Sequence, residues 1–92
     1  MVKKYRLRNS TIEAIFYDGT NYDEIASFCN GNAYKPYYSE KGVRLFTLNT
    51  RFGETKVHPK EYIVRLGYRL FISVKENIFL DRYEEASEES EI

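Results

Sequence analysis

The chain has 92 residues, which is room for one hydrophobic core, because a second core would need about 50 residues of its own. Its hydrophobic fraction of 42% excludes a disordered protein, and no apolar run approaches the ~18 residues of a membrane helix. The net charge is zero, but residues 84–92 hold five of the 14 acids, so residues 1–83 carry 14 bases against 9 acids. We therefore expect a basic folded body and an acidic end.

The first clear element is a strand over 11–17. Its side chains alternate between two faces, one with Ile12, Ala14 and Phe16 and the other with Glu13, Ile15 and Tyr17. The basic start of the chain, VKKYRLR, runs into a polar stretch and lacks the apolar core of a signal peptide, so we expect a cytoplasmic protein.

A short helix is predicted over 22–30, because its apolar residues recur at spacings of three and four. They are Tyr22, Ile25, Phe28 and Cys29. Thr20 or Asn21 is expected to cap the helix with its side chain, and Gly31 is expected to end it in a left-handed conformation. We expect Ile25 and Phe28 to pack against the strand face that carries Ile12, Ala14 and Phe16.

Residues 31–41 are polar and aromatic without a clear period, and Pro36 excludes a central strand, so this stretch is predicted to be a loop or an edge strand. The segments 43–49 and 54–57 then form a predicted hairpin, with Gly53 in its turn.

A second, tighter hairpin is predicted from 61–66 and 68–74, with Gly67 at a positive φ between them. Ser73 and Glu76 have the spacing of a capping box, which predicts one helical turn at 77–79. Residues 80–83 are expected to return as a final short strand.

These elements predict an α+β fold: a small, curled antiparallel sheet of five or six strands, with one short helix packed on one face. Residues 1–83 form the single predicted domain, and residues 84–92 a disordered acidic tail. A domain of this size leaves much of its surface unburied, so we expect a homo-oligomer that covers the remaining aromatic surface.

A ligand-binding site is predicted where aromatic and basic residues interleave along YIVRLGYRLF. Tyrosine can stack on a base, and arginine or lysine can pair with a phosphate. The predicted site residues are Lys60, Tyr62, Arg65, Tyr68 and Arg69. In the alternative interpretation Tyr62, Val64, Leu70 and Ile72 fill the core and the arginines form a solvated face.

Catalysis would need Cys29 or a serine as nucleophile and His58 as base. Cys29 lies on the apolar face of the predicted helix, where a cysteine is usually a buried small side chain, and His58 precedes a proline in a turn. One cysteine and one histidine form neither an internal disulfide nor a zinc set. We expect no enzymatic activity, no metal and no cofactor.

A set of residues spread over nearly the whole chain up to Tyr83 follows a pattern of four short motifs. The residues are Tyr5, Arg6, Ile12, Glu13, Ala14, Ile15, Pro59, Tyr62, Ile63, Ile78, Phe79 and Tyr83. Through them the chain resembles a family of short uncharacterised proteins encoded by phages and prophages, which read K-Y-R-K, then I-E-A-I-Q-W, later P-G-D-Y-I-I, and finally I-F-x-x-x-Y. In this chain Phe16-Tyr17 replaces the Gln-Trp pair, and Lys60-Glu61 replaces Gly-Asp.

The resemblance implies a phage accessory protein of the bacterial cytoplasm, and such proteins often blunt host defence. We therefore expect a non-enzymatic, counter-defence binding protein. It would either sequester a small nucleotide-type immune signal or block a host defence protein. The alternatives are a nucleic-acid-binding protein, in which the acidic tail suppresses non-specific contacts, and a structural or interaction module of phage origin. Nucleic acid is the less expected partner, because the positive charge is modest and no recognition motif is present.

Overall fold

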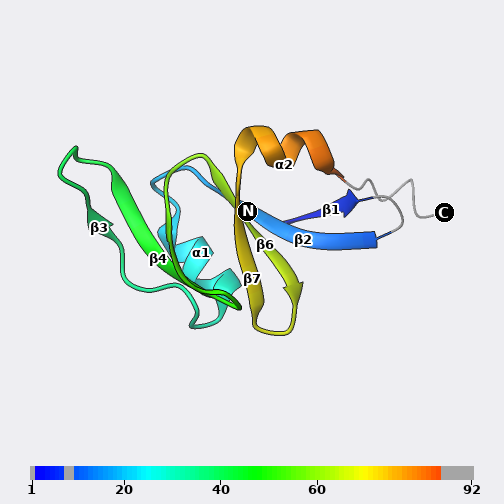
Figure 1. Cartoon of the computed structure of the whole chain (residues 1–92), viewed down its shortest axis with the longest axis horizontal. Helices are drawn as coiled ribbons and strands as arrows, with labels where there is room; N and C mark the ends of the chain where they lie inside the picture. The colour runs from blue at the N-terminus through cyan, green and yellow to red at the C-terminus, as the bar shows by residue number, and fades with distance from the viewer. Residues whose placement is uncertain (1, 8–9, 86–92) are drawn as a thin grey trace.

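The computed structural model describes residues 2–7 and 10–85, which form two antiparallel sheets and two helices (Figure 1). The elements in chain order are β1 (Lys3–Leu7), β2 (Ser10–Tyr17), α1 (Tyr22–Cys29), β3 (Tyr37–Tyr38), β4 (Arg44–Thr50), β5 (Gly53–Val57), β6 (Glu61–Gly67), β7 (Leu70–Lys75), α2 (Glu76–Arg82) and β8 (Glu84–Glu85). The predicted α+β class and both predicted hairpins are confirmed. The molecule is elongated, with extents of 47 × 24 × 21 Å.

The predicted single sheet is wrong, because the described strands separate into two sheets. A five-stranded sheet has the order β7-β6-β2-β1-β8, and a three-stranded sheet has the order β3-β4-β5. In the larger sheet Ile15 lies opposite Ile63 and Glu13 lies opposite Arg65. The smaller sheet contributes Phe46, Leu48 and Val57 to the core cluster that also holds Ile15 and Ile63. Each sheet thus has an apolar face, and the two faces bury one another.

Helix α1 belongs to this same core cluster, through Ile25, Phe28 and Cys29. It shares the cluster with Ile15 and Tyr17, so the prediction that it packs on the opposite face of β2 is wrong. Strand β2 is apolar on both faces, and alternation alone does not say which face receives the helix.

The other face of the large sheet is covered by α2, which lies at the top of the view in Figure 1. Ala14, Tyr62, Val64 and Phe79 form the core there, and Ile12 and Phe16 pack against it. The Phe79 ring stacks on Tyr62 at 3.9 Å and on Tyr83 at 4.7 Å. The large sheet is therefore buried on both sides by separate layers.

The second helix is longer than its sequence predicts. Residues 80–82 are helical, which contradicts the predicted strand over 80–83. The residue before the helix is Lys75, in an extended conformation and without a side-chain cap, so the predicted Ser73 capping box does not form. Stacking of Phe79 and Tyr83, four residues apart, favours a helix because such residues lie on one face.

The strands nearest the two chain termini also differ from the prediction. The basic segment Lys3–Leu7 is a strand, β1, which the sequence analysis did not predict. Glu84 and Glu85 pair with β1, so these two residues belong to the sheet and not to the predicted tail. The rest of that predicted tail, 86–92, lies outside the described residues.

The capping of helix α1 differs from the prediction at both of its ends. Asn21 is its N-cap residue, but it makes no side-chain cap hydrogen bond. Its side-chain amide donates to the Phe16 carbonyl at 2.7 Å, and its Oδ1 accepts from the Asp18 N–H at 2.9 Å. At the other end Asn30 is already left-handed, with φ of 51°, one residue before Gly31. Asn21 therefore closes the turn that leads from β2 into the helix.

The β6–β7 turn does not place Gly67 at a positive φ. The left-handed residue is Arg69, with φ of 54°, and the pairing shifts its register between Arg65 and Gly67. Lys60, just before β6, is also left-handed, with φ of 72°. Both positions would suit glycine, yet each carries a long cationic side chain.

Candidate ligand-binding site

The five residues of the predicted site do not come together. Lys60 precedes β6, whereas Tyr68 and Arg69 form the turn after it. A strand rises about 3.3 Å per residue, so the length of β6 separates Lys60 from Tyr68 by roughly 25 Å. Tyr62 and Arg65 lie between them on opposite faces of the sheet, because their side chains are an odd number of residues apart.

Tyr62 is a core residue. Its side chain is 8% exposed, and its ring lies between Phe79 and Phe16, whose centroids are 3.9 Å and 5.0 Å away. A ligand base would have to displace α2 to stack on this ring. The alternative interpretation, in which Tyr62, Val64, Leu70 and Ile72 fill the core, is confirmed for Tyr62 and Val64, and Ile72 packs against them partly buried. Its solvated arginine face is wrong for Arg65, which the protein itself contacts.

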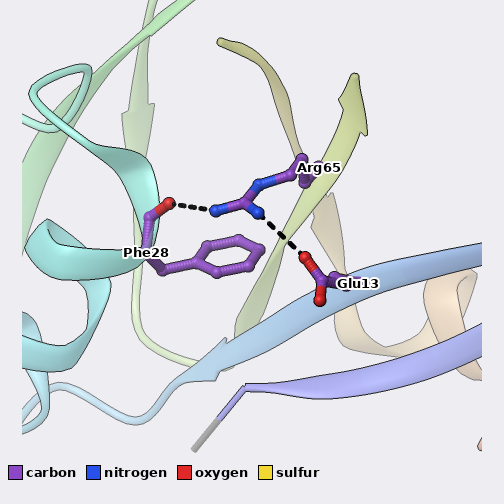
Figure 2. A network of polar contacts seen from close by, with 3 residues as sticks. All are labelled: Glu13, Phe28 and Arg65. Carbon is purple, nitrogen blue, oxygen red and sulfur yellow. Dashed lines mark hydrogen bonds and ion pairs between the residues drawn. The ribbon is translucent and has the colours of Figure 1, made fainter. Parts of the chain in front are cut away.

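Arg65 is held by the protein itself (Figure 2). Its Nη1 donates to Glu13 Oε1 at 2.9 Å, and its Nη2 donates to the Phe28 carbonyl at 2.9 Å. The guanidinium also lies over the rings of Phe28 and Phe71, at 4.7 Å and 5.6 Å. Helix α1 has no basic residue in its last turn, and Arg65 supplies a positive charge there from the sheet. Arg65 therefore ties the helix to the sheet.

Three predicted residues line a hollow that we call the hairpin corner. Its lining is Ser27, Asn30, Arg65, Tyr68, Arg69 and Phe71, and its volume is about 220 Å³. Small-molecule sites usually measure about 300 to 1,000 Å³. The corner also adjoins the C-terminal end of α1, whose carbonyl groups repel an anion. The Tyr68 side chain is 86% exposed beside Arg69, so little holds a ligand there.

A larger hollow lies on the outer face of the three-stranded sheet. Its volume is about 660 Å³, and we call it the tyrosine groove. Tyr37 pairs with Leu45, and Thr47 pairs with Lys56, so these four side chains share one face of the sheet. The aromatic and charged side chains that line the groove, together with its histidine, are Tyr37, Tyr38, Glu40, Lys41, Lys56 and His58.

The loop that carries Lys41 is closed by its own hydrogen bonds. The Ser39 N–H donates to the Val43 carbonyl at 2.8 Å, and the Gly42 N–H donates to the Ser39 carbonyl at 2.9 Å. Gly42 adopts a φ of 79°, which glycine accepts without strain. The rim of the groove is therefore formed by a compact turn that follows β3.

A second hollow, of about 470 Å³, adjoins the groove at His58, which lines both. We call it the lysine hollow, after Lys60 and Lys75. The His58 Nδ1 lies 3.5 Å from Glu61 Oε2. Burial raises the pKa of the Glu61 carboxyl above its ordinary value, and the nearby His58 opposes that rise. The Glu61 side chain is only 13% exposed, so its carboxyl group lies closer to His58 than to the solvent.

The tyrosine groove was not predicted from the sequence, because the apolar residues of 31–41 show no regular spacing. The available signal was compositional, because the stretch NAYKPYYSEK holds three tyrosines and two lysines around Pro36. Pairing of Tyr37 with Leu45 on β4 puts the Tyr37 side chain on the same sheet face as Lys56, which is distant in sequence, and the exposed Tyr38 also lines the hollow.

Cys29 is fully buried, as predicted, and burial raises the pKa of its thiol to about 12. The thiol is therefore protonated at neutral pH and is a poor nucleophile. Within residues 2–7 and 10–85, no three His, Cys, Asp or Glu side chains are grouped to hold a metal ion. Neither described helix has the length and apolar character needed to cross a membrane.

Comparison of the chain with protein-family models, with curated proteins and with solved structures found no match.

Proposed function

We propose that this protein is a non-enzymatic binding protein that holds a nucleotide-type ligand in the tyrosine groove. The observation that carries the proposal is the lining of that hollow, which combines Tyr37 and Tyr38 with Lys41, Lys56 and His58 in about 660 Å³. Its volume lies within the usual range for small-molecule sites. Aromatic rings and cations are the two kinds of group that nucleotide recognition requires.

In this proposal the tyrosines stack on the base and the lysines bind the phosphate. Tyr38 is 71% exposed and Tyr37 is 38% exposed, so their rings remain accessible to a base. Stacking of a base on an aromatic ring is worth about 1 to 3 kcal/mol. Within the described residues, the ammonium groups of Lys41 and Lys56 form no ion pair, which leaves them able to bind phosphate.

The biological role follows from the phage context that the resemblance implies. A small protein that binds a nucleotide-type immune signal without transforming it lowers the free concentration of that signal and so blunts host defence. Because Tyr38 lies exposed at the groove, a homo-oligomer in which a second copy covers the ligand would bind it more tightly.

The test is a thermal-shift and calorimetric screen against linear and cyclic adenosine and guanosine nucleotides. A ligand should raise the melting temperature of the parent protein. The Tyr38→Ala variant should bind that ligand roughly tenfold more weakly, because one stacking surface is lost. Tyr68→Ala is the matched control, since it removes an exposed tyrosine outside the groove. Equal affinities in Tyr38→Ala and the parent would refute the assignment of the groove.

A second candidate function, blocking of a host defence protein, is favoured by the tips of the two hairpins. Phe52 is 85% exposed beside Arg51, and Tyr68 is 86% exposed beside Arg69. Aromatic and arginine side chains dominate the binding energy of protein interfaces. A plaque assay on a defence-carrying host separates the two candidates. Loss of protection in Phe52→Ala/Tyr68→Ala, with protection retained in Tyr38→Ala, would favour the host-protein candidate.

A further inference from the structure

We infer that the tyrosine groove and the lysine hollow are one continuous site, and that its ligand is a dinucleotide whose second phosphate is bound by Lys60 and Lys75. This inference rests on the proposed function. The two hollows share His58 in their linings. Each of them alone, at about 660 and 470 Å³, falls in the size range of small-molecule sites. A mononucleotide would therefore occupy only part of the joined site.

The arrangement of cations matches two separated phosphates. Lys41 and Lys56 line the first hollow, Lys60 and Lys75 line the second, and His58 lines both. In a diphosphate the two phosphate groups share one bridging oxygen, whereas in a dinucleotide a nucleoside separates them. A dinucleotide therefore suits cations that line two separate hollows. Tyr37 and Tyr38 line the first hollow and not the second, so the first base stacks in the first hollow.

Carboxylates in the lysine hollow determine how the second phosphate is held. Glu61 and Glu76 line the same hollow, so its net charge is small. Glu61 is largely buried against His58 and lies opposite Lys75 in the strand pairing, whereas Lys60 is exposed and forms no ion pair among the described residues. The second phosphate is thus bound by direct contact with ammonium groups, and a general positive field contributes little.

The backbone of Lys60 provides an independent observation. Its φ is 72°, a left-handed conformation that disfavours any residue with a β-carbon. Its N–H donates to the Tyr17 carbonyl at 2.7 Å, which fixes the turn. Its side chain is exposed, and within the described residues the ammonium makes no hydrogen bond or ion pair. The hydrogen bond holds the Lys60 backbone in place, and its ammonium group is left available to a phosphate in the lysine hollow.

The decisive experiment compares titrations of adenosine monophosphate and the linear dinucleotide pApA by calorimetry. The parent should bind pApA at least tenfold more tightly than the monophosphate. Lys60→Gly should lose most of that advantage while binding the monophosphate as the parent does. Because glycine tolerates the left-handed φ, this variant should also melt at a higher temperature, which excludes misfolding as the cause. Lys35→Ala, an exposed lysine outside both hollows, is the matched control.

Three outcomes would overturn the inference. If the parent binds the monophosphate and pApA equally and Lys60→Gly changes neither, the lysine hollow is not part of the site, although the proposed function stands. If affinity continues to rise along a series from two to ten nucleotides, the surface is a tract for single-stranded nucleic acid and not a dinucleotide site. If neither compound binds and no nucleotide in the wider screen does, the proposed function fails as well.

Discussion

The hairpin corner and the tyrosine groove have the same ingredients but differ in what those ingredients contact. Both combine tyrosine with basic residues. In the corner, the guanidinium of Arg65 is engaged by Glu13, by the Phe28 carbonyl and by two aromatic rings. In the groove, Lys41 and Lys56 have no ion-pair partner among the described residues. Aromatic and basic composition therefore identifies a ligand site only when the cations are not already satisfied by the fold.

The largest expected effect is a loss of stability when Phe28, which packs on Phe71 and Arg65 of the hairpin corner, is truncated. Phe28→Ala should lower the free energy of unfolding by about 3 to 5 kcal/mol, because a 5% exposed ring that packs on Phe71 and Arg65 leaves a cavity. Urea titration measures this loss, and Phe52→Ala, which truncates an 85% exposed ring, is the control. A Phe28→Ala protein as stable as the parent would mean that α1 does not dock on this face.

The next effect tests the contrast between the two regions directly. Arg65→Ala should cost about 2 kcal/mol of stability, because it removes two charge-assisted hydrogen bonds at a partly exposed site. Lys56→Ala should change stability by less than about 0.5 kcal/mol and should weaken nucleotide binding.

Both quantities should be measured on the same two proteins, by urea titration and by calorimetry. If Arg65→Ala weakens nucleotide binding without loss of stability, Arg65 belongs to the ligand site. If Lys56→Ala unfolds the protein, Lys56 has a structural role, and either result contradicts the contrast between corner and groove.

The smallest effect is a dependence of stability on pH next to the groove. Because burial raises the pKa of Glu61 in the folded state, the folded protein retains a proton there that the unfolded chain releases. The resulting stabilisation is fully present below the pKa of the unfolded chain and is lost as pH rises through the folded pKa.

The Glu61→Gln variant cannot release that proton, so its melting temperature should exceed that of the parent by more at pH 7 than at pH 4. Thermal melts of both proteins across this range measure the difference, with Glu54→Gln on an exposed strand position as the control. A constant difference at all pH values would show that the Glu61 carboxyl keeps its ordinary pKa in the fold.

Much of the local structure could be predicted because its signals come from residues close together in the chain. The alternation at 12–17 identified β2, and the spacing of Ile25, Phe28 and Cys29 identified α1. The turn signal at Gly53 located the β4–β5 hairpin, where the glycine adopts a φ of 106°. The burial of Cys29 followed from the same helical spacing.

Strand β1 and helix α2 could not be predicted in the same way. In the segment Lys3–Leu7 only Tyr5 and Leu7 alternate with basic residues, which is too short a pattern to predict a strand. The segment becomes a strand because β2 offers it a pairing edge. Residues 80–82 look like a strand in isolation, and they are helical because Phe79 and Tyr83 stack above the sheet.

The sequence by itself determined the fold class, the hairpins and the first helix, since patterns of period two and spacings of three to four reflect local backbone geometry. Only the tertiary structure decided which face of β2 receives α1, what Arg65 contacts and which residues form the candidate site. Arg65 meets Glu13 and Phe28 across 52 and 37 residues of chain, and the groove joins Tyr37 to Lys56 across two strand pairings. These long-range contacts depend on which strands pair and on which layer packs against each apolar face. Neither can be read from a short stretch of sequence.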